Sequence, residues 1–182
     1  RIMLSGQALE KETRNLVAAL RTPHVRGRWG EATLRRVVEL VGMVERCDFR
    51  EQVTLGGDGG ARRPDMIVHL PDGRDVVVDA KTPLEAYLQA AEASDEETRS
   101  AALKTHARHV RERCSELAQK SYWAEMRCTP ELVILFLPGE PFLAAALQQE
   151  PGLLEEAMSK GVVLATPASL FSPLQCRPYQ NG

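Results

Sequence analysis

The residues best suited to chemistry lie at one end of a segment typical of a β-hairpin, "RPDMIVHLPDGRDVVVDAK" (63–81). Asp65 precedes the first apolar run, and Asp79 and Lys81 close the second. Two carboxylates that face each other across a hairpin repel unless positive charge lies between them. Lys81 supplies part of that charge, and a divalent cation would supply more, because Mg²⁺ prefers carboxylate oxygens together with water and phosphate. The pattern predicts a Mg²⁺ or Mn²⁺ site where water attacks a phosphate beside Lys81.

A plainer interpretation of the same residues is a solvated strand end with a salt bridge between an aspartate and a lysine. Pro-Asp and Asp-x-Lys are each common by chance, so neither motif is specific alone. Together, at hairpin separation and on one face, they favour the metal site over the salt bridge.

The turn of the hairpin decides which residues face each other. Pro-Asp-Gly at 71–73 fits a three-residue loop, in which a type I turn is followed by a left-handed glycine. This loop pairs Asp65 with Asp79, Ile67 with Val77, and His69 with Asp75. One face is then wholly apolar and is predicted to be core: Met66, Val68, Leu70, Val76, Val78 and Ala80. The other face carries Asp65, Asp79 and Lys81 at one end.

Hydrophobic periodicity predicts the elements that position this hairpin. Expected helices cover 2–21, 28–43, about 83–93, about 97–120, 140–150 and 151–160, with another opening at 167–171; Pro23 and Gly27 are expected to interrupt the chain between the first two. Expected strands outside the hairpin are 50–55, 131–138 and 161–166. This order predicts an α/β fold with a mixed central sheet flanked by helices.

Composition limits the class of protein. The chain has 182 residues, 43% hydrophobic and 26% charged, as in a soluble globular domain. Its formal net charge of −2 requires that any nucleic acid be met by a local basic patch. The four cysteines are widely spaced, which favours free thiols in a reducing compartment. No apolar run approaches the length of a membrane span.

Six segments carry a resemblance to a known family: 26–34 ("RGRWGEATL"), 63–73, 76–87 ("VVVDAKTPLEAY"), 106–123, 129–143 and 161–170. The order of parts is similar to the PD-(D/E)xK nuclease superfamily, and the chain resembles the RmuC family of DNA recombination proteins. The resemblance implies a restriction-endonuclease-like core that cleaves DNA with Mg²⁺ or Mn²⁺ and uses no small-molecule cofactor. It also implies a role in limiting rearrangement at inverted repeats.

The resemblance assigns roles to particular residues. Asp65 matches the Pro-Asp motif, Asp79 and Lys81 match the (D/E)-x-K motif, and Glu31 matches the acidic residue of the helix before the sheet. The expected catalytic set is therefore Glu31, Asp65, Asp79 and Lys81, with the three acids as metal ligands. Without the resemblance, Glu31 would be taken as an acid in the first turn of its helix.

The resemblance also implies the organisation of a longer protein. Residues 1–22 are expected to end an upstream helix or coiled coil, 23–172 to form the nuclease-like domain, and 173–182 to be an irregular tail. A coiled coil would allow a homo-oligomer, and the full-length protein is expected to carry an N-terminal anchor to the inner membrane, whereas the present piece is expected to be cytoplasmic.

Basic and aromatic residues around these motifs are candidate DNA contacts. The set is Arg26, Arg28, Trp29, Arg63, His106, Lys120 and Tyr122. Each has a structural alternative: solvated helix surface for the arginines, packing at a helix start for Trp29, plain surface for His106, and a helix-end cluster for 120–123. Glu140 is either a supporting acid of the metal site or an acid at a helix start.

Two other functions remain open from the sequence. The chain could be a DNA-structure-binding module that keeps the fold without efficient turnover, or a coiled-coil-linked assembly scaffold whose hairpin charges are only surface. The sequence does not distinguish an endonuclease from an exonuclease, nor a single-stranded, duplex or branched substrate.

Overall fold

A five-stranded mixed sheet forms the centre of the computed structural model, which describes residues 20, 22–43, 49–51, 64–70, 73–80, 83–119 and 132–174, the last four by backbone only. The strands lie side by side in chain order: β1 (Phe49–Glu51), β2 (Met66–His69), β3 (Asp75–Asp79), β4 (Val133–Phe136) and β5 (Val162–Ala165). The pairs β1–β2 and β2–β3 are antiparallel, whereas the pairs β3–β4 and β4–β5 are parallel. The predicted α/β class with a mixed sheet is confirmed.

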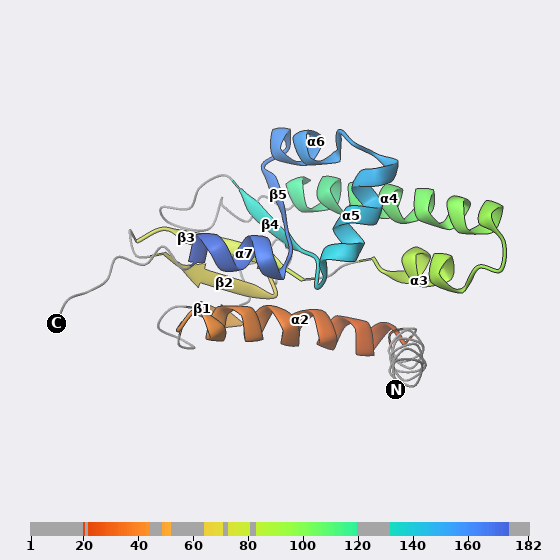
Figure 1. Ribbon diagram of the computed structural model, residues 1–182. Coiled ribbons are helices and arrows are strands. Elements are labelled where there is room, and N and C mark those ends of the chain that lie inside the picture. The colour runs from red at the N-terminus through yellow and green to blue at the C-terminus, as the bar shows by residue number, and fades with distance from the viewer. Residues whose placement is uncertain are drawn as a thin grey trace, which may run out of the picture.

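Helices cover both faces of the sheet (Figure 1). The described helices are α2 (Pro23–Leu40), α3 (Glu85–Glu92), α4 (Glu96–Gln119), α5 (Glu140–Gln149), α6 (Leu153–Ser159) and α7 (Pro167–Leu174). The α2 and α7 helices pack on one face and contact each other, while α4, α5 and α6 pack on the opposite face. The α3 helix packs along α4.

Both faces of the hairpin are buried, because alternate residues enter different cores. Val78 packs with Leu34 and Val38 of α2, whereas its neighbour Val77 packs with Val110 of α4. Both hairpin valines are fully buried. The face that carries Asp79 is therefore no solvated surface, and a carboxylate there needs a partner inside the protein.

The predicted register of the hairpin is confirmed where the structure describes it. Ile67 pairs with Val77 and His69 with Asp75, as the three-residue loop requires. Gly73 has a φ of 81°, and its N–H donates to the Leu70 carbonyl over 3.0 Å. Positive φ is easily reached by glycine alone, so this turn chemistry sets the pairing of the strands. Residues 71 and 72 lie outside the described residues.

The α2 helix begins earlier than predicted, at Pro23 instead of residue 28, and the expected interruption at 22–27 is wrong. Proline is tolerated in the first turn of a helix because its missing N–H would have no helical partner there. Thr22 is the N-cap residue, and Gly27 lies within the helix. The helix ends at Leu40, three residues before the predicted end, and Gly42 follows its last turn with a φ of 82°, as expected of a glycine that terminates a helix.

Gly30 allows α2 to approach the end of β3 closely. A Cβ built at Gly30 would lie 2.8 Å from the carbonyl oxygen of Ala80, closer than nonbonded atoms tolerate. The next residue of the helix is Glu31, and Ala80 directly follows Asp79. This backbone contact therefore holds the predicted acid of the helix beside the predicted acids of the hairpin.

Several predicted boundaries also change. The α3 helix begins at Glu85 with Leu84 as its N-cap, so Pro83 precedes the helix, and Thr82 lies outside the described residues. The α7 helix continues to Leu174, so residues 173 and 174 are helical instead of part of an irregular tail. Gln52–Leu55 of the predicted first strand, residues 1–19, and residues 175–182 lie outside the described residues.

The helix–strand contact at Gly30 gives a test with a matched control. We expect Gly30→Ala to lower the free energy of unfolding by about 1–3 kcal/mol, because the added methyl meets a backbone oxygen that cannot rotate away. Gly27→Ala, in the same helix and with no atom within 4 Å of the new Cβ, should raise it by up to about 1 kcal/mol. Urea denaturation measures both. Equal effects of the two substitutions would contradict the close approach.

Candidate functional site

The site is built at the end of the hairpin where β2 begins and β3 ends. Asp65 immediately precedes β2, and its Oδ2 accepts a 2.7 Å hydrogen bond from the backbone N–H of Ala80. Asp79 is the last residue of β3 and is 3% exposed. The hydrogen bond ties the two strand ends together and holds the Asp65 carboxylate next to Asp79.

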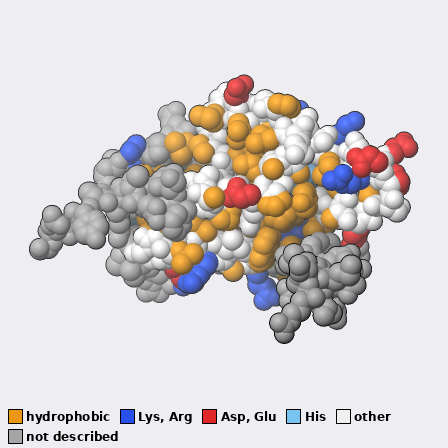
Figure 2. All heavy atoms as spheres, in the orientation of Figure 1, with side chains coloured by type: hydrophobic (Ala, Val, Ile, Leu, Met, Phe, Trp, Pro, Cys, Tyr) orange, Lys and Arg blue, Asp and Glu red, His pale blue; other side chains and the backbone are white. Residues whose placement is uncertain are grey.

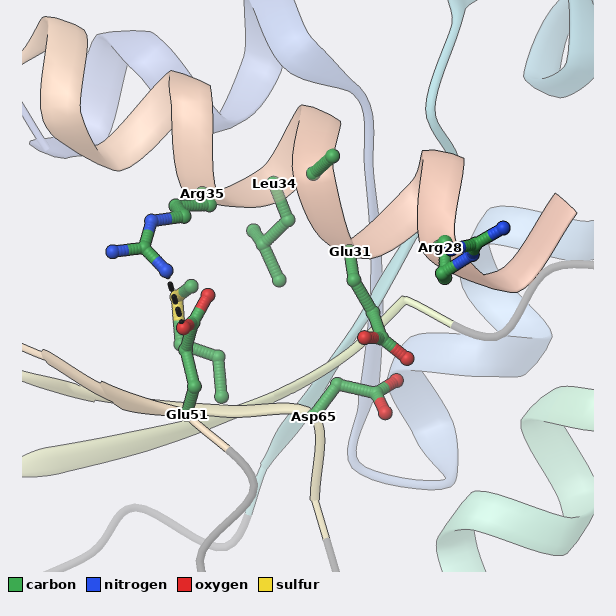
Figure 3. A pocket seen from close by; sticks show the side chains of 8 residues that line it. Arg28, Glu31, Leu34, Arg35, Glu51 and Asp65 are labelled. Carbon is green, nitrogen blue, oxygen red and sulfur yellow. Dashed lines mark hydrogen bonds and ion pairs between the residues drawn. The ribbon is translucent and has the colours of Figure 1, made fainter. Parts of the chain in front are cut away.

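Glu31 of α2 is the third acid near this end of the hairpin, and its charge contributes to the raised pKa of Asp65. Its carboxylate and that of Asp65 point toward each other across the space between α2 and the sheet (Figure 3). A cleft of about 330 Å³ opens beside this pair, lined on the α2 side by Arg28, Glu31 and Arg35. These three positions are spaced three and four residues apart, so they share one face of the helix.

Two arginines therefore flank the acid along the cleft. Arg35 is held by 2.9 Å and 3.0 Å bonds to Glu51 of β1 and Glu39 of α2. Arg28 is exposed at the other end of the same face. Arg28 thus places positive charge beside the carboxylates, where a phosphate could be contacted, whereas the charge of Arg35 is engaged by two glutamates.

The Asp65 carboxylate is in an electrostatically unfavourable position. Burial, the charge of Asp79 and the charge of Glu31 together raise the pKa of Asp65 from 3.8 to about 6. The N–H of Ala80 and the charge of Arg113 oppose this rise without cancelling it. Excess negative charge at a partly buried site is the condition that a bound cation relieves.

Asp79 is paired inside the protein with Arg113 of α4. The Nη2 atom of Arg113 lies 2.9 Å from both carboxylate oxygens, and the Arg113 side chain is only 14% exposed. Nη1 of the same guanidinium bonds Glu116 over 2.7 Å. Arg113 was not among the predicted site residues. It borders the inward stripe of α4 (Val110, Cys114 and Leu117), where an arginine requires an acidic partner.

The donor chemistry of the three acids fits a hard divalent cation, because carboxylate oxygens are the ligands such ions prefer. Glu31, Asp65 and Asp79 are the residues that would hold it. Within the described ranges, however, no three acidic, histidine or cysteine side chains are already gathered around one ion position. The Asp79 oxygens face Arg113, so metal binding would require the Asp79 carboxylate or the guanidinium to shift.

Four predicted site residues lie outside the described residues: Arg63, Lys81, Lys120 and Tyr122. Arg26 is half-buried and lines a second cleft of about 390 Å³, together with His109 and Arg113. Glu140, at the start of α5, accepts a hydrogen bond from the backbone N–H of Ala168 in the first turn of α7. The structure thus places Glu140 at a helix start and not with the three acids.

His106 is not a surface residue, and the expectation that it contacts DNA is wrong. It is 0% exposed, its Nε2 lies 2.9 Å from the carbonyl oxygen of Phe142, and burial lowers its pKa. Tyr87 packs edge-on against both the His106 ring and the Phe142 ring. A histidine at this position of α4 belongs to the helix packing.

Trp29 belongs to the same aromatic cluster. Its ring meets Phe142 edge-on with centroids 6.0 Å apart, and the residue is half-buried. The cluster therefore joins α2, α3, α4 and α5 through Trp29, Tyr87, His106 and Phe142. This contact favours the packing interpretation of Trp29 over base stacking.

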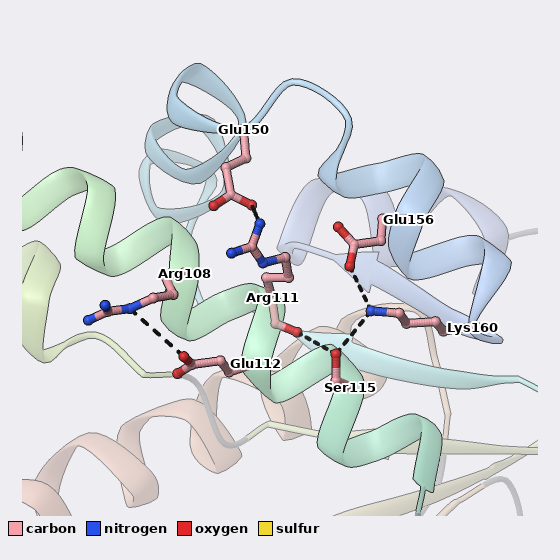
Figure 4. A network of polar contacts seen from close by, with 7 residues as sticks. All are labelled: Arg108, Arg111, Glu112, Ser115, Glu150, Glu156 and Lys160. Carbon is pink, nitrogen blue, oxygen red and sulfur yellow. Dashed lines mark hydrogen bonds and ion pairs between the residues drawn. The ribbon is translucent and has the colours of Figure 1, made fainter.

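Basic residues on and beside the outer side of α4 form ion pairs. Arg111 of α4 lies 3.1 Å from Glu150, the residue after α5, and Lys160, the residue after α6, bonds both Glu156 and Ser115 (Figure 4). On the face drawn in Figure 2, hydrophobic side chains gather in the middle, and the described Lys and Arg side chains are scattered near its margins. The exposed Arg28, beside Glu31 and Asp65, is therefore a better candidate for a phosphate contact than these paired side chains.

Comparison with known proteins places the chain in a family. A family model described as the RmuC family matches residues 1–179. The chain belongs to the RmuC family. This confirms the resemblance drawn from the sequence motifs.

Two relatives in the RmuC family are 44% and 37% identical to this chain at matched positions. The chain is 44% identical over 172 residues to a DNA recombination protein RmuC homolog of Zymomonas mobilis, covering 93% of the chain and 38% of that protein. It is 37% identical over 171 residues to the DNA recombination protein RmuC of Escherichia coli K12, covering 92% of the chain and 36% of that protein. The chain thus spans well under half the length of these relatives. No solved structure matches it.

None of the described helices is both long enough and apolar enough to cross a membrane.

The raised pKa of Asp65 predicts a pH-dependent gain in stability for Asp65→Asn. The folded-state pKa of Asp65 is above the unfolded value. The free energy of unfolding of the wild type therefore falls as the pH rises through about 6 and Asp65 ionises in the folded protein. Without metal, the variant should match wild type near pH 4 and exceed its free energy of unfolding by about 1–2 kcal/mol at pH 8. Urea denaturation in EDTA measures this. Glu155→Gln, on the exposed side of α6, is the control and should show no such trend.

Proposed function

We propose that this chain is a divalent-metal-dependent deoxyribonuclease domain that acts in DNA recombination. The proposal is carried by one observation: the carboxylates of Glu31 on α2 and of Asp65, directly before β2, point toward each other, and burial together with the charges of Asp79 and Glu31 raises the pKa of Asp65. The names of the relatives, DNA recombination protein RmuC and its homologs, point to DNA as the substrate. Limiting rearrangement at inverted repeats, as the sequence resemblance implies, is part of this proposal.

The acids would hold Mg²⁺ or Mn²⁺. When bound, the ion would lower the pKa of a coordinated water and offset the charge that develops on the phosphate. Asp65 is oriented for this role by the N–H of Ala80, and Glu31 approaches from the opposite side of the cleft. Lys81, the lysine of the Asp-x-Lys motif, would orient the attacking water and contact the scissile phosphate.

Arg28 and Arg35 would position the DNA backbone. They lie three residues before and four residues after Glu31 on the face of α2 that lines the cleft. Seven residues of α-helix span roughly 10 Å, which is enough to contact phosphates on both sides of the one that is attacked. Neither side chain is proposed to recognise bases, so the expected contacts are independent of sequence.

A DNA-structure-binding module without efficient turnover is the second candidate. The observation that favours it is the pairing of Asp79 with Arg113, because both oxygens of this predicted ligand are already in use. The two functions share the cleft and differ in whether the acids bind a metal ion.

Cleavage assays separate these functions. With single-stranded and duplex DNA and either Mg²⁺ or Mn²⁺, we expect metal-dependent cleavage by the wild-type chain. Asp65→Asn and Lys81→Ala should each lower the rate by at least about 10²-fold, because each removes a group that stabilises the transition state. Glu155→Gln, at an exposed position of α6, is the control and should cleave DNA at the wild-type rate. DNA binding without cleavage would favour the binding module, and neither activity would favour the assembly scaffold.

The salt dependence of DNA binding tests the arginines of the cleft. Arg28→Ala should weaken binding to all DNA sequences alike and lower the slope of log affinity against log salt by about one, because one phosphate contact is lost. Arg99→Ala, on the exposed first turns of α4, should leave the slope unchanged. Fluorescence anisotropy over a salt series gives both slopes. An unchanged slope for Arg28→Ala would remove this residue from the interface.

A further inference from the structure

Arg113 is a cation that pairs directly with the buried Asp79 carboxylate. Its Nη2 bridges the two Asp79 oxygens at 2.9 Å each, and the carboxylate is almost completely withdrawn from water. A buried carboxylate without a positive partner is strongly destabilising, so the fold depends on some cation at this position. The Nε of Arg113 is buried and donates no hydrogen bond to any described residue. The guanidinium is thus held mainly by its terminal nitrogens.

The same two oxygens are those that a divalent ion at Asp79 would use. A guanidinium and a metal ion repel each other, so each weakens the hold of the other on one carboxylate. Binding of the ion is therefore expected to draw Asp79 and Arg113 apart or to weaken their contact.

The structure offers Arg113 an alternative position. The second cleft, of about 390 Å³, lies between the first turns of α2, the start of α3 and the middle of α4, and Arg113 forms part of its wall. Three glutamates also line it: Glu85, Glu112 and Glu116. Nη1 already bonds Glu116 over 2.7 Å, so the guanidinium could leave Asp79 and keep a carboxylate partner.

We propose that Arg113 is a positioning residue that occupies the cation position at Asp79 in the metal-free protein and competes with the divalent ion for the Asp79 carboxylate. The inference rests on the proposed function, because it concerns the same metal site. Glu116 acts through Arg113 by providing the partner to which the guanidinium moves when the ion binds. Metal affinity in this chain is therefore set partly by a residue that is not a metal ligand.

Binding of Mn²⁺ alone, followed through the electron paramagnetic resonance signal of the free ion, tests the competition without measuring cleavage. Arg113→Met keeps an unbranched side chain of about the length of the aliphatic part of arginine and removes the charge. We expect this variant to bind Mn²⁺ about tenfold more tightly than wild type, because the ion no longer displaces a buried ion pair. Its thermal midpoint should be lower without metal and should rise more than that of wild type on adding Mn²⁺.

Glu116→Gln provides a second variant that should fold, because the Glu116 side chain is 61% exposed. It keeps Arg113 but weakens its alternative partner, so Mn²⁺ affinity should fall by up to about fivefold. Arg111→Met is the matched control: it lies on the same helix and pairs with Glu150, as Figure 4 shows, and its Mn²⁺ affinity should equal that of wild type.

The outcomes separate this inference from the proposed function. Binding of Mn²⁺ by wild type and its loss in Asp65→Asn would support the metal site. If, in that case, neither Arg113→Met nor Glu116→Gln changes the affinity as stated, the competition is disproved and the metal site is retained. If neither wild type nor any variant binds Mn²⁺, both the proposed function and this inference are overturned. Tighter binding by Arg113→Met with an unchanged Arg111→Met control supports the competition.

Discussion

The close approach of α2 to the end of β3 is the constraint on which the site depends. Gly30 lets the helix backbone lie against the Ala80 carbonyl, and this contact fixes where Glu31 stands relative to the hairpin. A larger residue would separate the helix from the sheet and would move one acid away from the other two. The carboxylates are therefore brought together by backbone packing, although their charges oppose it.

The negative charges of the two aspartates are accommodated in different ways. Asp79 is deeply buried and is paired with a guanidinium, whereas Asp65 keeps access to the cleft and has a raised pKa instead. A half-buried carboxylate that borders a cleft can take up a proton or an ion from solution, but a fully buried one must be neutralised by the protein itself. The two aspartates, adjacent in the fold, thus have different requirements because their burial differs.

Local sequence chemistry was sufficient to predict the hairpin. The Pro-Asp-Gly turn acts over a few residues, so the pairing of Ile67 with Val77 followed from the turn alone. The α/β class and most elements followed from periodicity in the same way. The role of Glu31 depended on family resemblance, because an acid near the start of a helix has a common structural explanation.

Partners distant in sequence were not predictable. Arg113 is 34 residues from Asp79, and nothing local to either residue specifies the other. His106 was assigned to the surface because arginines surround it in sequence, yet its side of α4 faces Tyr87 and the Phe142 carbonyl. The start of α2 was misplaced because Pro23 was taken as a helix breaker, although proline in a first turn is compatible with a helix.

The aromatic cluster has a consequence for the interpretation of genetic data on this fold. Phe142 lies on α5, yet it contacts Trp29, which is two residues from Glu31, and Tyr87, which packs on α4 through His106. Phe142 thus packs between α2, which carries Glu31, and the Tyr87–His106 pair on α3 and α4, the latter of which carries Arg113. An inactive variant at Phe142 would report altered spacing between those helices. Such a loss of activity would not by itself mark Phe142 as a residue that contacts a ligand.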